Sequence, residues 1–178
     1  MNLYNLHNEP RTLDKYDEVL QFPEFAYGKL KDDYYEEHTD EKLLHVISKS
    51  AEYSYKWANY CDKRFALGEN AISKDPGFAY RYARDVLHSR FALGEEAIAT
   101  DGRASFFYAK YILHDRFELG ENSIRELILQ NMTPALLNVA VTYAVEIMHE
   151  RWDEEIENKM FAAEFIGMER YKNYFGLK

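Results

Sequence analysis

The chain has very little cysteine, proline and tryptophan, and it has no long apolar segment. Its 178 residues include one Cys, four Pro and two Trp. A single thiol, Cys61, cannot close an internal disulfide, so the composition fits a reducing compartment such as the cytoplasm. No apolar run approaches the roughly 18 residues that a membrane-spanning helix needs, and the first residues lack the apolar stretch of a signal peptide. We therefore expect a cytoplasmic protein that does not bind membranes.

Positive charge is also scarce. The formal net charge is −9, from 22 Lys and Arg against 31 Asp and Glu. Residues 1–50 hold 11 acidic and 6 basic residues, residues 51–126 hold 12 and 11, and residues 127–178 hold 8 and 5. The acidic excess therefore lies toward the two ends. Because a phosphate backbone requires a basic face, the charge disfavours direct binding to nucleic acid.

One short sequence motif, which we call the phrase, occurs three times in the middle of the chain. It reads RFALGENAI from Arg64, RFALGEEAI from Arg90 and RFELGENSI from Arg116, at a spacing of 26 residues. A worn fourth copy has its Arg-aromatic pair at Arg151 and Trp152. A unit of this length cannot bury an apolar stripe alone, so neighbouring copies are expected to stack.

Each copy is predicted to be a pair of helices. In the second copy, Phe78, Tyr82 and Val86 recur at helical spacing. The small residues Ala79 and Ala83 lie between them and would let a neighbouring helix approach closely. The sequence thus predicts an all-α fold, an α-solenoid of stacked two-helix repeats of about 26 residues with N- and C-terminal caps. We expect one compact domain, with an acidic N-terminal segment or cap at 1–50, helical repeats at 51–160 and a capping helix at 161–178.

The repeated phrase is expected to serve the stacking. The glycines are placed in the turn or in the first turn of the second helix: Gly68, Gly94 and Gly120. The arginines are expected to pair with a nearby Glu rather than to line an anion-binding groove: Arg64, Arg90 and Arg116. The Phe and Leu of each copy, such as Phe91 and Leu93, are expected to fill the seam between copies. The many tyrosines are interpreted as half-buried rings whose hydroxyls meet water.

Several patterns resemble chemical sites but favour a structural reading. Histidines precede the arginine by two residues in three copies: His88, His114 and His149. Stacked repeats would hold them roughly 10 Å apart, too far to share a zinc ion. Glu146 and His149 match half of a di-iron motif, but a second Glu-x-x-His is missing. We therefore predict no catalytic residue, no metal and no cofactor.

The second and third copies resemble a short helical repeat found in uncharacterised proteins of large tailed bacteriophages and giant viruses. The matching residues are Tyr82, Ala83, Val86, Leu87, Arg90, Phe91, Gly94, Glu95 and Ile98. The resemblance covers about residues 45–126. It implies a viral accessory protein that acts in the host cytoplasm, and it implies no enzymatic activity.

Our first hypothesis is a non-enzymatic protein-binding module, a phage factor that modulates a host protein or defence system. The alternative is an acidic inhibitor that imitates nucleic acid and occupies a host DNA- or RNA-binding protein. An enzyme and a structural subunit of a viral particle are further classes, and the oligomeric state stays open. Residues outside the shared phrase are the candidate contacts to a protein partner. They are Tyr34, Tyr35, Glu36 and Glu37 in the N-terminal segment, and Arg81, Arg84, Phe107 and Lys110 on the exposed sides of the first helices.

Overall fold

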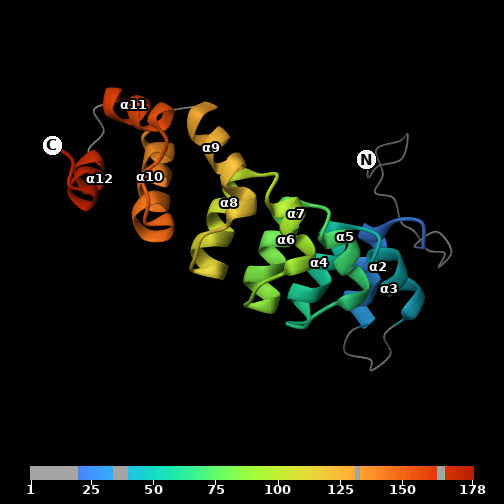
Figure 1. The fold of residues 1–178 in the computed structure, drawn as a ribbon. Coiled ribbons are helices and arrows are strands. Elements are labelled where there is room, and N and C mark those ends of the chain that lie inside the picture. Colours follow the sequence, from blue (N-terminus) through green and yellow to red (C-terminus); the bar gives the residue numbers. More distant parts are fainter. Residues whose placement is uncertain (1–19, 34–39, 131–132, 164–166) are drawn as a thin grey trace, which may run out of the picture. The chain divides into compact units, whose positions relative to one another are not determined.

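The chain is all-helical in the part that the structure describes, as the sequence predicts. The computed structural model describes residues 20–33, 40–130, 133–163 and 167–178, and these ranges contain no β-strand (Figure 1). The α-helices are α2 (Pro23–Asp33), α3 (Glu41–Ile47), α4 (Ala51–Tyr60), α5 (Glu69–Ile72), α6 (Pro76–Tyr82), α7 (Glu95–Ile98), α8 (Gly102–Tyr108), α9 (Glu121–Gln130), α10 (Pro134–Thr142), α11 (Glu154–Ala162) and α12 (Met168–Phe175). They form two compact units, Met1–Ile72 and Ser73–Lys178.

The first unit is built on the packing of α2 against α3. Leu30 of α2 is 2% exposed, and Leu43 and Ile47 of α3 are at most 1% exposed. The side chain of Asp40 accepts hydrogen bonds from the backbone N–H groups at the start of α3, and Ser50 does the same for α4. These caps satisfy N–H groups that have no partner inside the helix.

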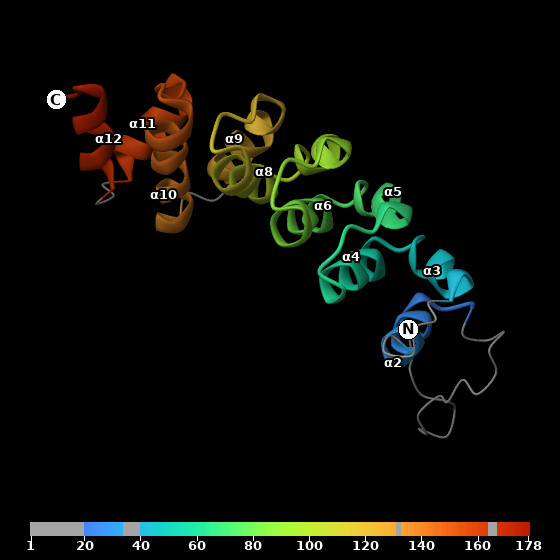
Figure 2. The ribbon, with the colours of Figure 1, turned by 90° about the horizontal axis from the view of Figure 1, so that it is seen from below.

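The second unit repeats one local design. Helices α6, α8 and α10 each begin at a side-chain cap: Asp75, Asp101 and Thr133 accept a hydrogen bond from a backbone N–H three residues later. Helices α6, α8, α10 and α12 follow one another in chain order, from green to red (Figures 1 and 2).

These first helices end in a wider turn that the sequence does not predict. Their last residues form π-helical turns: Ala83–Leu87, Ala109–Leu113 and Tyr143–Met148. Helix α4 of the first copy has no such turn, and that copy is one residue shorter before its Arg. A π-turn absorbs one extra residue in a helix, which accounts for the difference in length.

The residue after each π-turn is a histidine with a left-handed backbone. The φ angles are 48° at His88, 52° at His114 and 56° at His149. Left-handed backbone commonly ends helices but is unfavourable for a residue with a Cβ. Each of these three histidines therefore marks a strained backbone position at the end of a helix.

The burial of the tyrosines and of the phrase leucines is the opposite of what the sequence predicts. Four tyrosines are fully buried rather than half-exposed: Tyr82, Tyr108, Tyr143 and Tyr171. The phrase leucines are exposed by 53% at Leu67, 58% at Leu93 and 57% at Leu119. The prediction that these leucines fill the seam is wrong, because the leucine side chain lies on a 3₁₀ turn that packs through its Phe and Gly. Phe65, Phe91 and Phe117 are buried, as predicted.

The phrase glycines permit close packing. Gly94 ends a 3₁₀ turn immediately before α7, and its φ is −95°. A Cβ at this position would lie 2.6 Å from Cδ1 of Phe91 and 2.8 Å from Cβ of Ala79. At Gly120 it would lie 2.4 Å from Oγ of Ser105. Glycine is therefore required here by space rather than by a positive φ.

Candidate functional site

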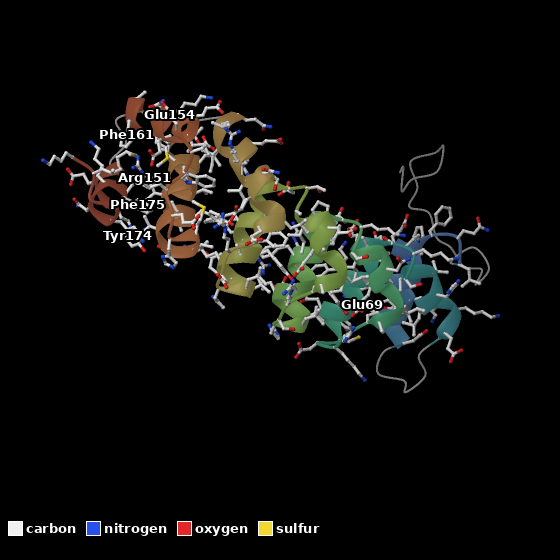
Figure 3. The ribbon with its side chains drawn as sticks, in the orientation of Figure 1. Glu69, Arg151, Glu154, Phe161, Tyr174 and Phe175 are labelled. Atoms are coloured by element: carbon white, nitrogen blue, oxygen red, sulfur yellow. The ribbon has the colours of Figure 1, made fainter. Side chains whose placement is uncertain are left out.

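Each copy of the phrase carries an internal Arg–Glu ion pair, as the sequence predicts. Arg90 donates from Nε and a terminal nitrogen to Glu95, at 2.6 and 2.7 Å. The same geometry joins Arg116 to Glu121 and Arg151 to Glu157, and in the first unit it joins Arg64 to Glu69. Figure 3 labels Glu69 and Arg151. These arginines are occupied and do not form an open anion-binding ladder.

A buried tyrosine from the following helix completes each network in the second unit. The Tyr108 hydroxyl donates to Glu95 at 2.9 Å and accepts the backbone N–H of Phe91 at 2.9 Å. Tyr143 bridges Glu121 and Phe117 in the same way, and Tyr171 bridges Glu157 and Trp152. The sequence signal for this role was the recurrence of Tyr82 as Tyr108, 26 residues later.

Two carboxylates of these networks, Glu95 and Glu157, have a lowered pKa. Burial raises the pKa of Glu95, but the hydrogen bonds from Arg90 and Tyr108 outweigh burial, and the pKa lies below its ordinary value. The hydrogen bond from Arg151 lowers the pKa of Glu157, and the bond from Tyr171 adds to it against burial. These carboxylates are ionised and already hold two donors each, so the network suits packing rather than catalysis.

A polar and aromatic surface of the second unit lies between α6 and α8. A groove of about 370 Å³ is lined there by a set that we call the aromatic groove: Tyr80, Arg81, Arg84, Arg103, Phe107 and Tyr111. Phe107 stacks on Tyr80 with ring centroids 6.0 Å apart and on Tyr111 with centroids 5.9 Å apart. Phe107 and Tyr111 remain 39% and 51% exposed. The groove thus presents the rings of Phe107 and Tyr111 to solvent, whereas the ring of Tyr80 is buried.

The aromatic groove gathers three of the candidate contacts expected from the sequence. Arg81, Arg84 and Phe107 all line it. Lys110, another candidate, sits beside the groove over the ring of Tyr111 and pairs with Glu146 at 3.2 Å. The remaining candidates lie outside the described residues: Tyr34, Tyr35, Glu36 and Glu37.

Two arginines of the groove keep their charge available. Arg84 is paired with Asp85 at 2.6 Å and stacks over Tyr80. Arg81 lies over the ring of Phe78, and Arg103 is exposed. Within the ranges that the structure describes, neither Arg81 nor Arg103 has a carboxylate oxygen within 4.0 Å of its guanidinium group. Arg103 was missed by sequence reasoning because its position, just after the Asp101 cap, suggested only a helix start.

A second hollow adjoins the aromatic groove and shares Arg103 and Phe107 with it. This apolar pocket, of about 430 Å³, is formed by α8, α9 and the start of α10, and its main lining residues are Phe106, Phe107, Leu127, Leu136 and Val139. The two hollows place exposed arginines directly beside an apolar cavity.

The residues of the di-iron-like motif have other partners. Glu146 accepts hydrogen bonds from Arg170 at 2.7 Å and pairs with Lys110. His149 Nδ1 lies 2.9 Å from the hydroxyl of Tyr174, a residue of α12 labelled in Figure 3. Among the described residues, no three His, Cys, Asp or Glu side chains gather as metal ligands would.

The first unit has its own hollow, an open groove of about 660 Å³ along α3. Leu44, Val46 and the exposed Leu67 line it, together with Glu41 and Lys42. Opposite charges flank the leucines, so the groove carries no net charge that would select a ligand.

Comparisons of the chain with protein-family models, with curated proteins and with solved structures gave no match. The resemblance to viral helical repeats therefore stays a prediction from the repeat residues. In the part of the chain with described coordinates, no helix has both the length and the apolar character to cross a membrane.

Proposed function

We propose that this protein is a non-enzymatic protein-binding module and that the aromatic groove of its second unit is the binding surface. The observation that carries the proposal is the pair Arg81 and Arg103, exposed beside stacked aromatic rings without a carboxylate partner among the described residues. Aromatic side chains and arginine supply most of the binding energy in protein interfaces. The exposed rings of Phe107 and Tyr111 add an apolar surface beside the arginines, and exposed apolar patches rimmed by polar residues mark interaction sites.

We further propose that the repeats stack in series as an α-solenoid. The tyrosine bridges support this arrangement within the second unit, because each one ties a helix to the phrase of the preceding copy. Tyr171 of α12 makes the last bridge, which gives the capping helix the same role as a repeat. A series of identical contacts of this kind is the organising principle of solenoids.

The resemblance to phage and giant-virus repeats supplies the biological setting of the proposal. A viral factor of this type would bind a host protein in the cytoplasm and change its activity. The alternative, imitation of nucleic acid by the acidic ends, gains no support from the groove, whose free charges are positive.

The proposal can be tested with the purified 178-residue chain used as bait in host-cell extract. Wild-type chain is compared with the double variant Arg81→Gln/Arg103→Gln and with Lys74→Gln, an exposed lysine of the same unit outside the groove. A partner that binds wild type and Lys74→Gln, is lost with the double variant, and re-forms a complex from purified components is the expected result. A partner retained by the double variant would place the binding surface elsewhere.

A further inference from the structure

We infer that the aromatic groove and the apolar pocket together recognise a short acidic segment of a partner protein, in which a carboxylate lies next to a large apolar side chain. The inference rests on the proposed function and adds the chemistry of the partner. The two hollows adjoin at Arg103 and Phe107, which line both of them.

The charge of the groove determines the sign of the charge that its ligand carries. Its lining holds three arginines and one aspartate, Asp101. The carboxylate of Asp101 already accepts the backbone N–H of Ala104 at 2.7 Å and caps α8. Arg84 is engaged by Asp85, so Arg81 and Arg103 supply the net positive charge. A guanidinium group binds a carboxylate through two parallel hydrogen bonds, which fixes orientation as well as charge.

The adjoining pocket sets the second requirement. Leu127, Leu136 and Val139 offer an apolar cavity of about 430 Å³ next to Arg103. An apolar side chain that is enclosed in such a cavity stabilises a complex, because its surface is removed from water. A leucine or phenylalanine within a residue or two of the carboxylate would therefore occupy the pocket while its acidic neighbour meets Arg103.

The same combination of rings and arginines occurs in proteins that bind single-stranded nucleic acid, but the surrounding charge favours a peptide. Nucleic-acid affinity requires several free cations along a backbone. Here Lys110 is paired with Glu146 and Arg84 with Asp85, and the chain carries a net charge of −9. Two free guanidinium groups match one or two carboxylates better than a run of phosphates.

The test is selection of a displayed library of random short peptides on the 178-residue chain at physiological salt. Binding is then measured for the enriched peptides. The variants are Arg103→Gln and Leu136→Ser, with Lys74→Gln as the control. We expect enriched peptides with Asp or Glu beside a large apolar residue. Arg103→Gln should weaken their binding by about tenfold to a hundredfold. Leu136 is 9% exposed, so circular dichroism must first show that Leu136→Ser is folded. If it is not, removal of the apolar residue from the peptide replaces that variant.

The outcomes separate the inference from the proposed function. Enriched peptides that depend on Arg103 but carry no acidic residue would overturn the inference and leave the groove as a protein-binding surface. If no enriched peptide depends on Arg103 or on the pocket, both the inference and the proposed surface are wrong. Tight binding of a fluorescein-labelled oligouridylate that is lost in Arg103→Gln, without peptide enrichment, would overturn both in favour of nucleic acid.

Discussion

The hydroxyl of Tyr108 lies 2.9 Å from a carboxylate oxygen of Glu95, a residue 13 positions earlier in the chain. The same hydroxyl accepts the backbone N–H of Phe91. Since Tyr108 is fully buried, its ring and its hydroxyl join two copies of the repeat through one side chain. In the second unit, each phrase thus contributes polar groups that the tyrosine of the following helix satisfies.

Tyr108→Phe should lower the free energy of unfolding by about 1–3 kcal/mol, because it leaves the buried Phe91 N–H without a partner. Tyr111→Phe is the matched control, since Tyr111 is 51% exposed, and it should change stability by less than about 0.5 kcal/mol. Chemical denaturation monitored by circular dichroism measures both. Equal effects of the two substitutions would contradict a structural role for the Tyr108 hydroxyl.

Glycine-to-alanine substitutions should have opposite signs at two positions. Gly94→Ala should destabilise by about 1–3 kcal/mol, because its Cβ would overlap the Phe91 ring. Gly28 lies in α2, and a Cβ there would meet nothing within 4 Å. Gly28→Ala should therefore stabilise by about 0.5–1 kcal/mol through lower chain entropy in the unfolded state. If Gly94→Ala were stabilising, the seam would have space for a Cβ at this position.

Acidification should remove the contribution of Glu95. Its pKa is lowered in the folded protein, so its stabilising effect is complete above the unfolded value of about 4.3 and is lost as the pH falls through the lower folded value. The melting temperature of Glu95→Gln should lie below that of wild type at neutral pH, and the difference should shrink at more acidic pH. A difference that stays constant or widens on acidification would refute the ionised network.

His114→Gly should stabilise the protein by about 0.5–1 kcal/mol, because glycine adopts the φ of 52° at this position without the strain of a Cβ. The same substitution at His45, an exposed residue inside α3, should destabilise by about 1 kcal/mol, since glycine weakens a helix interior. Thermal denaturation of both variants gives the comparison. Loss of stability in His114→Gly would mean that the histidine side chain contributes more than its backbone costs.

Leu93→Ser should leave stability within about 0.5 kcal/mol of wild type, because Leu93 is 58% exposed. Phe91→Ala, two residues away and 4% exposed in wild type, should cost about 3–5 kcal/mol. The midpoint of urea unfolding separates the two cases. A large loss of stability in Leu93→Ser would show that the leucine does pack in the seam.

The sequence by itself determined the helical class, the caps and the ion pairs. The Asp75 and Asp101 caps depend on local geometry, and Arg90 and Glu95 are close enough in the chain to meet within one turn and a half. Such short-range relations follow from residue type and spacing alone.

Only the tertiary structure decided which of the recurring residues are buried. Either Leu93 or Tyr108 could belong to a buried helical stripe by residue type, yet the leucine faces solvent and the tyrosine is enclosed. The reason is a long-range contact: Gly94 brings the phrase so close to Ala79 that the Phe91 ring fills the seam, and the Tyr108 hydroxyl is the group that can reach the buried N–H. The meeting of Arg81 with Arg103 around one groove also depends on the packing of α6 against α8, which neither helix encodes alone.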